Sequence, residues 1–513
     1  MAIYQGTGHL VAFARESSSG VAPSSGWKTL APLATGGVSG NLTTYVSVLD
    51  ESMTTRMMNG KPVHVDKDAT PTLTFNLKKQ VMDFWLPAML RSTPVTPWAG
   101  AQVLYATAAV DGGGSADSFT VAGAPTLPAG TLILVRGFAN AANNGVKVLV
   151  AGSNATTLNV ATATVIAETI AAGLVTIEVC GFQFNAGDLQ VNASNNLIST
   201  SQSLTVFGLA IGHPILVGGS AVGEQFTTLG GKAIAYVSAA VTTNLIQLQY
   251  QAKITDRNTT TTWGGADTGA AKTVRIWFGP FICNLANEDP ALIAEPSWHM
   301  ESRYTDGVAA DALYSYTEQM ILNRSTLSLG IGQAATLALQ FHARDVTDPV
   351  VAGSRVAGPS TAYPEIAKDL FDATCGMWLS RVVKEADAAT LIAEINAATI
   401  TLALGGQARK QLANCGSVGY NFDYFAPMIS LTPYFARTST MDAVSALTDC
   451  RYEALLSNGQ GALLVHSPCG TLTRSGETIA AGQPITEDMS FTPYPHPSTG
   501  IGISVAVFPY VPW

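Results

Sequence analysis

The fold class is decided by one stretch of short apolar runs between turn-forming residues, GFANAANNGVKVLVAGSNATTLNV at positions 137–160. Its runs VKVLV and TLNV are rich in the β-branched residues that strands prefer, and steps of Asn, Gly and Ser separate them. Asn144 and Gly145 form a pair that tight hairpin turns favour. The stretch therefore predicts antiparallel strands, and similar runs along the chain predict a mainly β protein.

Glycine-rich loops can also bind phosphate, and two stretches come close to the known patterns. In EQFTTLGGKA (224–233), Phe226 stands where a P-loop has its first glycine, and Ala233 stands where it has Ser or Thr. GIGQAA (330–335) lacks the third glycine of a dinucleotide-binding loop and precedes a strand. These glycines are therefore interpreted as turns, and no cofactor is expected.

Composition restricts the class of protein further. Of 513 residues, 47% are hydrophobic and only 12% are charged. A free monomer needs a charged surface, so this balance indicates a surface covered by neighbouring copies. No run reaches the roughly 18 apolar residues of a membrane span, and no secretion signal is visible at the N-terminus. The net charge of −9 argues against a protein that grips nucleic acid.

No catalytic or metal-binding constellation is predicted. The six cysteines are scattered and the seven histidines lack metal-ligand spacing. VHSPCG (465–470) brings His466, Ser467 and Cys469 together in sequence, but adjacency alone does not make a nucleophile with its base. Asp66 and Asp68 are spaced as in a calcium loop, without its glycine or glutamate. We expect a protein that is not an enzyme.

Internal similarities predict repeats. GTLILVRGF (130–138) matches GHPILVGGS (212–220), which predicts two small inserted β-modules at 101–180 and 181–275. TLSLGIGQA (326–334) resembles TITLALGGQA (399–408), and a strand followed by a short helix is predicted at both 71–85 and 429–447. A β-domain is therefore expected twice. The first copy comprises 1–100 and 276–355, and the second comprises 356–513. Pro87 should end or kink the first helix.

One long loop carries a candidate function. Residues 47–75 predict a strand, a polar loop with two methionines, and a second strand. A loop of this length within a hairpin is uncommon unless it has a role, and adaptable methionines suit a contact surface. We expect an assembly arm between subunits, although a merely flexible loop is the alternative. The candidate contact residues are Thr54, Arg56, Met57, Met58, Asn59 and Lys61.

The order of these features resembles that of the major tail tube proteins of long-tailed, non-contractile bacteriophages. The resemblance lies in the 47–75 hairpin with its helix, PSWHMESRYTDG (296–307) before YSYTEQMILNRSTLSLGIG (314–332), GSVGYNFDYFAPMISLTPYF (416–435) and GISVAVFPYVPW (502–513). It covers nearly the whole chain, but no single motif is a fingerprint. The chain departs from simpler relatives because its tube domain is duplicated.

The resemblance implies two tandem tail-tube domains of β-sandwich or barrel-like form, with the β-modules as decoration. It implies rings that stack into a tube in the virion tail after assembly in the host cytoplasm. Three chains with pseudo-sixfold symmetry would make a ring, with a hexamer as the alternative. The implied partners are further copies, the tape measure protein and DNA in the lumen, and the tail terminator and tip proteins. A tail fibre or carbohydrate-binding decoration protein is the alternative function.

Overall fold

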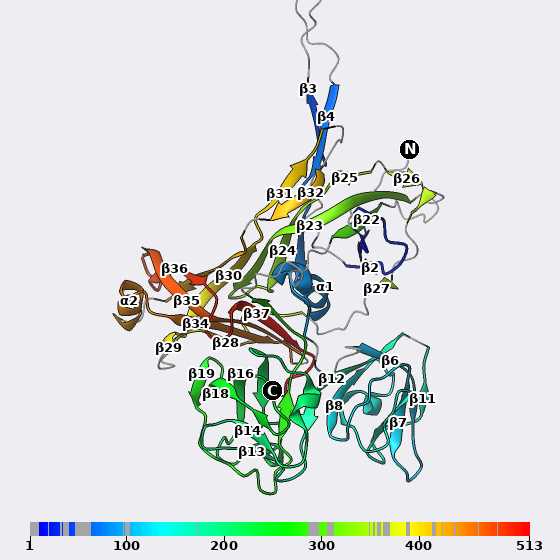
Figure 1. Ribbon diagram of the computed structural model, residues 1–513, viewed down its shortest axis with the longest axis vertical. Coiled ribbons are helices and arrows are strands. Elements are labelled where there is room, and N and C mark those ends of the chain that lie inside the picture. Colours follow the sequence, from blue (N-terminus) through cyan, green and yellow to red (C-terminus); the bar gives the residue numbers. More distant parts are fainter. Residues whose placement is uncertain are drawn as a thin grey trace, which may run out of the picture. The chain divides into compact units, whose positions relative to one another are not determined.

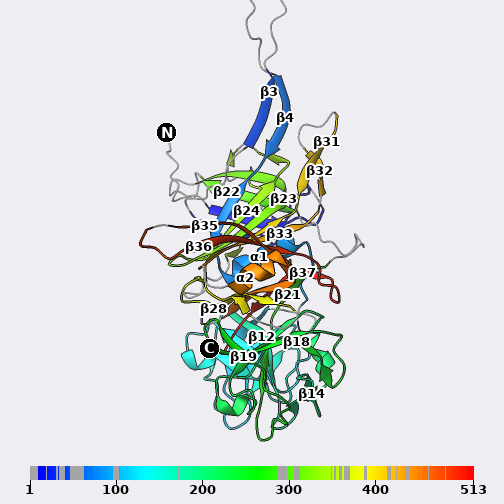
Figure 2. The ribbon, with the colours of Figure 1, turned by 90° about the vertical axis from the view of Figure 1, so that its left-hand side faces the viewer.

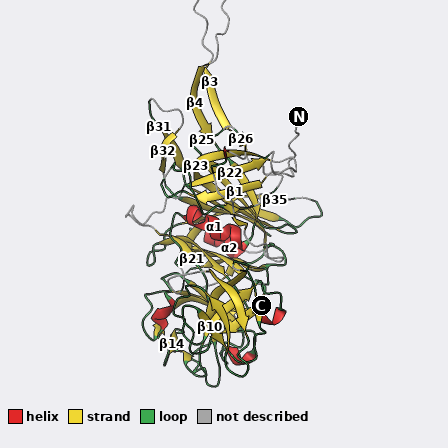
Figure 3. Cartoon of the chain, turned by 90° about the vertical axis from the view of Figure 1, so that its right-hand side faces the viewer, coloured by secondary structure: helices red, strands yellow, loops and turns green. Residues whose placement is uncertain are grey.

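Of the residues that the structure describes, 53% lie in strands and 7% in helices, which confirms the predicted mainly β class (Figure 3). Contacts divide the chain into two units, residues 1–91, 291–365 and 397–430, and residues 92–290, 366–396 and 431–513. The computed structural model describes residues 10–18, 20–30, 33, 41–46, 63–95, 97, 103–171, 173–285, 297–304, 312–347, 349–351, 354–356, 361–362, 370–385, 390–412, 417–422, 424–434, 438–459, 461–479 and 481–512. Within these ranges no helix is long and apolar enough to cross a membrane.

The first unit contains an antiparallel sheet in the order β1–β22–β23–β24–β5. β22 pairs with the first half of the long strand β23, and β24 pairs with its second half. We call these strands, with helix α1, the first repeat. Its elements are β1 (Leu10–Arg15), β5 (Thr72–Asn76), α1 (Lys79–Leu90), β22 (Trp298–Tyr304), β23 (Leu313–Gly330) and β24 (Thr336–His342).

Helix α1 is held by an aromatic core. The ring of Trp85, which is fully buried, lies 5.2 Å from the rings of Phe13, Trp298 and Phe341. Of the two outcomes predicted for Pro87, an end or a kink, the end was wrong, because the helix continues to Leu90. Burial of the three residues after the proline offsets the hydrogen bond that proline cannot make.

The second unit contains a sheet of the same kind, with β34, β35 and β36 following one another as β22, β23 and β24 do. β28 lies beside β34, and β36 pairs with β33, whose residues up to Ser430 are counted in the first unit. We call these strands, with helix α2, the second repeat. Its elements are β28 (Met377–Lys384), β33 (Ala426–Pro433), α2 (Thr438–Ser445), β34 (Cys450–Ser457), β35 (Ala462–Thr478) and β36 (Thr486–Pro493).

The two repeats agree in detail. The Glu16 amide donates to the Ser297 carbonyl at 2.9 Å, and the Glu385 amide donates to the Asp449 carbonyl at 3.0 Å, at the corresponding place. A one-residue register break also recurs. It lies between the pairs Trp298–Met320 and Met300–Thr317 in the first repeat, and between Cys450–Gly470 and Tyr452–Ser467 in the second. The predicted duplication of strand–helix domains therefore has a counterpart in the strand register.

One of the sequence similarities behind that prediction was misassigned. Residues 326–334 and 399–408 are not corresponding segments, because β23 and β30 (Ile395–Ala403) are antiparallel partners, with Thr326 facing Thr401. The counterpart of the first segment is the end of β35 and its turn. Gly332 and Gly482 have φ angles of 74° and 76° at matching turn positions, and Gln follows each of them.

The pairing of β30 with β23 also makes the compact units differ from the domain boundaries expected from sequence. Residues 397–430 belong to the first unit, although they were expected in the second domain. Residues 92–290 belong to the second unit, although the modules were expected within the first domain. The strand that follows the modules, β21 (Phe281–Leu285), pairs with β37 (Ile501–Phe508), which explains this second difference.

Further short strands complete these sheets and hairpins. They are β2 (Lys28–Thr29), β3 (Asn41–Val46), β4 (Val63–Ala69), β25 (Asp345–Val346), β26 (Val350–Val351), β27 (Thr361–Ala362), β29 (Thr390–Ile392), β31 (Gly406–Lys410) and β32 (Ser417–Phe422).

The two segments predicted as modules lie in the insert between α1 and β21, and the same hydrogen-bond pattern recurs in each. In the first, the amide of Gly130 donates to Leu149 and that of Leu149 donates to Thr131, both at 2.8 Å. In the second, Gly212 donates to Val237 at 2.7 Å, and Val237 donates to His213 at 3.0 Å. The modules nevertheless form one body, because β12 pairs with β20 and a single apolar core runs through both.

The first module contains β6 (Val103–Val110), β7 (Asp117–Val121), β8 (Thr131–Arg136), β9 (Gly145–Val148), β10 (Thr157–Val160), β11 (Glu168–Thr169) and β12 (Val175–Gln183). The second contains β13 (Leu189–Val191), β14 (Leu197–Ser199), β15 (Pro214–Val217), β16 (Lys232–Val237), β17 (Leu245–Ile246), β18 (Leu248–Asp256), β19 (Thr259–Thr262) and β20 (Arg275–Trp277).

The prediction of a tight two-residue turn at Asn144 and Gly145 was wrong about the length of the loop. These residues end a longer loop between β8 and β9 that contains a 3-10 turn. The Asn144 side chain closes this loop by accepting from the amide of Phe138 at 3.0 Å and donating to its carbonyl at 2.8 Å. Gly145, with a φ of 94°, starts β9. No phosphate site is needed to explain this glycine.

Candidate functional site

The predicted assembly arm is a hairpin at its base. β3 and β4 pair from Asn41–Ala69 to Val46–Val63. The candidate contact residues Thr54, Arg56, Met57, Met58, Asn59 and Lys61 lie outside the residues that the structure describes. β4 leads through a bridge between Ala69 and Ala343 into β5, so the arm continues a strand of the first repeat.

A second hairpin, which the sequence did not predict, occupies a similar place in the second half of the chain. β31 and β32 pair from Gly406–Phe422 to Lys410–Ser417 and lead into β33, as β3 and β4 lead into β5. Leu412, beyond the end of β31, is 94% exposed. The signal that was overlooked is the short glycine-flanked run GGQARK before a strand.

The second half of β23 is paired along both edges (Figure 1). β24 lies on one side, and β30 lies on the other from Arg324–Ala403 to Gly330–Ala397. Asn323 anchors the end of β30, because its backbone carbonyl accepts from the Leu404 amide and its side chain accepts from the Gly406 amide, both at 2.8 Å. One repeat thus receives a strand that belongs, by sequence order, to the next.

The corresponding half of β35 is paired along one edge only. β36 pairs with it from Gly470–Pro493 to Thr478–Thr486 (Figure 2). Among the described strands, none takes the position that β30 has beside β23. β34 and β37 pair only with the first part of β35, up to Gly470 and His466 respectively.

Exposure of apolar side chains distinguishes the two edges. Leu329 is 3% exposed in the first repeat, whereas Ile479 at the matching position is 68% exposed. Ala335 is fully buried, whereas its counterpart Ile485 is 40% exposed. Ile479 and Ile485 lie in the turn between β35 and β36. An unpaired edge of a strand is a template for another strand. This edge, the residues of β35 from Thr471 to Thr478 on the side away from β36, is called the open edge below.

A buried ionic cluster joins the insert to the second repeat. Glu453, which is fully buried, accepts from Arg381 Nε at 2.7 Å and from Arg451 Nε at 3.2 Å. Tyr236 of the insert stacks on His466 of β35 with ring centroids 4.0 Å apart. Tyr236 belongs to an apolar core whose residues come from insert strands and from β28, β34, β35 and β37. The insert is therefore packed against the sheet of the second repeat.

Titration in this cluster follows from burial and charge. Burial opposes ionisation of Glu453, but the guanidinium groups of Arg381 and Arg451 outweigh it and lower the Glu453 pKa to about 2. Burial lowers the pKa of His466 to about 3, although Glu453 acts in the opposite direction. His466 is therefore a neutral stacking partner at pH 7.

The VHSPCG stretch shows no nucleophile aimed at a substrate. The Ser467 hydroxyl donates to the Gly502 carbonyl at 2.8 Å, and its neighbour His466 stacks on Tyr236. Cys469 is buried. These residues, adjacent in sequence, therefore make separate packing contacts.

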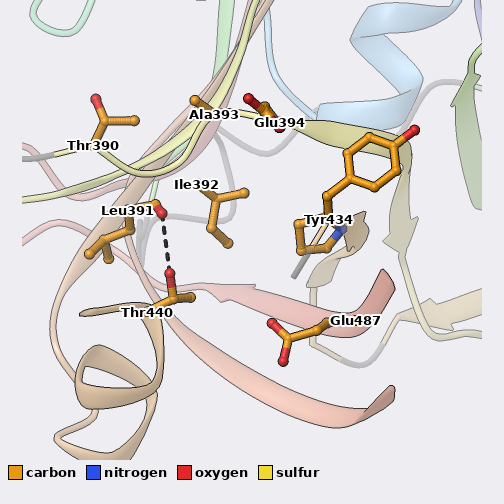
Figure 4. A pocket seen from close by; sticks show the side chains of 9 residues that line it. Thr390, Leu391, Ile392, Ala393, Glu394, Tyr434, Thr440 and Glu487 are labelled. Atoms are coloured by element: carbon orange, nitrogen blue, oxygen red, sulfur yellow. Dashed lines mark hydrogen bonds between the residues drawn. The ribbon is translucent and has the colours of Figure 1, made fainter. Parts of the chain in front are cut away.

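A small cavity lies beside α2 and β29 (Figure 4). Its volume is about 70 Å³, below the range of small-molecule sites. The carboxylates of Glu394 and Glu487 line it, and Thr440 donates to the Leu391 carbonyl at 3.2 Å. Glu487 is paired with Arg474 at 2.9 Å. Neither here nor elsewhere in the described ranges does a group of three or more His, Cys, Asp or Glu residues lie close enough together to hold a metal ion.

Neither a scan against protein-family models nor a search of curated proteins finds a match for this chain. The functional argument therefore rests on the geometry of its two repeats and their edges.

Proposed function

We propose that this protein is a structural subunit whose copies join through strand pairing into closed rings, which stack into the tail tube of a long-tailed bacteriophage. The pairing of β30 with β23 is the observation that carries the proposal. It adds to the first repeat a strand that precedes the second repeat in the sequence. The same pairing between chains would join the second repeat of one copy to the first repeat of another.

In this pairing between copies, the open edge of the second repeat would accept the incoming strand. Its partner would be a strand from the first repeat of a second copy. Closed rings remove every exposed edge, whereas an open sheet invites uncontrolled pairing. Two repeats per chain fit three chains around a pseudo-sixfold ring.

The low charge of the chain supports burial between copies. The two hairpins, β3–β4 and β31–β32, would serve as arms between stacked rings, one from each repeat. The net charge of −9 suits a wall along which DNA must pass without binding. In this proposal the tape measure protein and DNA occupy the lumen, and terminator and tip proteins close the ends of the virion tail.

Electron microscopy of the purified full-length chain tests the proposal. We expect rings of three chains, and tubes at higher concentration. Dispersed monomers at high concentration would contradict it, and a ring of six chains with true sixfold symmetry would contradict the stoichiometry. Deleting residues 54–61 should leave folded subunits that form rings but do not stack.

A matched pair of substitutions tests the open edge itself. Ile479→Asp places a charge at the end of the open edge, and Ile331→Asp places one at the turn after β23, whose edges are already paired. Both isoleucines are more than half exposed, so both variants should fold. We expect Ile479→Asp to remain monomeric and Ile331→Asp to form rings. Equal assembly of the two variants would refute the assignment.

A further inference from the structure

The open edge of β35 and the occupied edge of β23 differ in one local feature, the position of an extra residue. In β23 the register against β24 breaks between Leu322 and Arg324, so Asn323 is the extra residue. In β35 the register against β36 breaks between Arg474 and Gly476, so Ser475 is the extra residue. The strands match on both sides of the break, since Leu322–Phe341 corresponds to Leu472–Phe491 and Ser328–Thr336 to Thr478–Thr486. The bulge has moved by two residues.

The position of the bulge matters because the extra residue of β23 is the one that anchors β30. Asn323 accepts two backbone amides from the incoming chain, those of Leu404 and Gly406. The stretch that follows, from Arg324 to Gly330, is regular and pairs with β30. In β35 the corresponding anchor position is Thr473, where the strand has no extra residue. The bulge at Ser475 instead interrupts the stretch that should pair.

Side chains hold the bulge of β35 at Ser475. The Ser475 hydroxyl donates to the Asp488 carbonyl at 2.9 Å. Arg474 pairs with Glu477 at 2.7 Å and with Glu487 at 2.9 Å. A bulge and charged side chains are two of the features that prevent an edge strand from accepting a partner. The side chains of this Arg474–Glu477 pair are 33% and 45% exposed, so the pair is weak enough to be released on association.

We infer that the open edge is held in a form that cannot pair, and that it accepts a second copy of this chain only when its bulge moves from Ser475 to Thr473. This inference rests on the proposed ring assembly and adds a step that controls it. Arg474 is the positioning residue for the closed form. Two free subunits would then pair slowly. An already formed ring that presents the incoming strand would favour the form of β35 with its bulge at Thr473.

Assembly kinetics of the full chain test this step. Arg474→Gln removes both ion pairs at the bulge, and it should shorten the lag of tube formation, followed by light scattering, by roughly fivefold. Arg324→Gln is the matched control, because Arg324 holds the corresponding position in an edge that is already paired. It should leave the lag unchanged. Thr473→Asn supplies the side chain that anchors β30 in the first repeat, and it should also shorten the lag.

A map of the assembled wild-type tube gives a second, independent readout. We expect the extra residue of β35 at Thr473, facing the strand of the neighbouring copy. An extra residue still at Ser475 in the tube would overturn the inference while leaving ring assembly intact, as would an unchanged lag for Arg474→Gln when wild-type tubes form. If the wild-type chain forms no rings, the proposed function fails, and the inference fails with it.

Discussion

Glu453→Gln tests the energetics of the cluster that joins the insert to the second repeat. The substitution keeps the size of the side chain and removes its charge. Glu453 is fully buried, and Arg381 and Arg451 are 3% and 2% exposed. Both guanidinium groups would therefore remain buried against a neutral amide. Removing one partner of a buried ion pair costs about 3–5 kcal/mol, because the remaining charge has lost its compensation.

The expected change in melting temperature follows from the size of the second unit. At about 2.1 cal/mol/K per residue, a unit of roughly 300 residues unfolds with an entropy of ~0.6 kcal/mol/K. A loss of about 3–5 kcal/mol should then lower its Tm by about 5–8 °C. Differential scanning calorimetry of the full chain measures this shift. The first unit, residues 1–91, 291–365 and 397–430, should keep its own transition.

Glu477→Gln is the matched control, since Glu477 also pairs with an arginine but is 45% exposed in its side chain. An exposed pair contributes at most about 1 kcal/mol. Adding Arg451→Gln to Glu453→Gln removes one of the two uncompensated charges and should recover part of the lost stability. A Glu453→Gln variant that melts no lower than Glu477→Gln would refute the reasoning.

Three further predictions concern pH, packing and backbone conformation. Burial lowers the pKa of His213 and of His466 to about 3. The unfolded chain therefore binds more protons below pH 6.5, and stability should fall as pH decreases from 6.5 towards 3, by about 1.4 kcal/mol per pH unit for each histidine. Urea unfolding at pH 7, 6 and 5 measures this, and constant stability would contradict it. Trp85→Ala should destabilise the first unit by about 3–5 kcal/mol in the same assay, because the ring is fully buried; a loss below about 1 kcal/mol would show that the aromatic core does not hold α1. Gly130→Ala should lower the Tm more than Gly145→Ala. Both glycines have φ angles near 95°, but only at Gly130 would the added methyl group meet a backbone oxygen, Gln183 O, at 2.5 Å. Equal shifts would contradict this.

Local sequence patterns predicted the strands and the repeated modules because the physics of each is local. Gly130 and Gly212 both have positive φ angles and both precede a buried strand, and this combination is visible in the sequence as a glycine shortly before Ile-Leu-Val. The strand and helix at 71–85 and 429–447 were equally visible, because a β-run followed by helical spacing needs no distant partner.

Long-range pairing was not visible. Residues 326–334 and 399–408 resemble each other because antiparallel partners in one sheet need the same alternation of β-branched and small residues, and periodicity cannot separate partners from copies. The rest of the candidate site depends on contacts between residues that are distant in the sequence. The open edge depends on an extra residue at Ser475, and nothing in TRSGE shows that the extra residue lies there rather than at Thr473.

The two repeats show how a duplicated sheet can keep a buried charge and change what covers it. Glu301 and Glu453 occupy corresponding positions, facing Tyr316 and His466 across the strand pair. Glu301 is bound by Arg355 at 2.6 and 2.9 Å and by the Tyr316 hydroxyl at 2.8 Å.

In the second repeat, arginines of the sheet itself bind Glu453, and Tyr236 of the insert covers His466. The buried carboxylate is therefore a feature of the sheet in both repeats. Arg355 covers it in the first repeat, and the insert covers this region in the second. A buried carboxylate tolerates no bare face, since an unpaired buried charge costs several kcal/mol. Loss of the insert would thus require a replacement for Glu453, whereas variation on the far side of the insert would not.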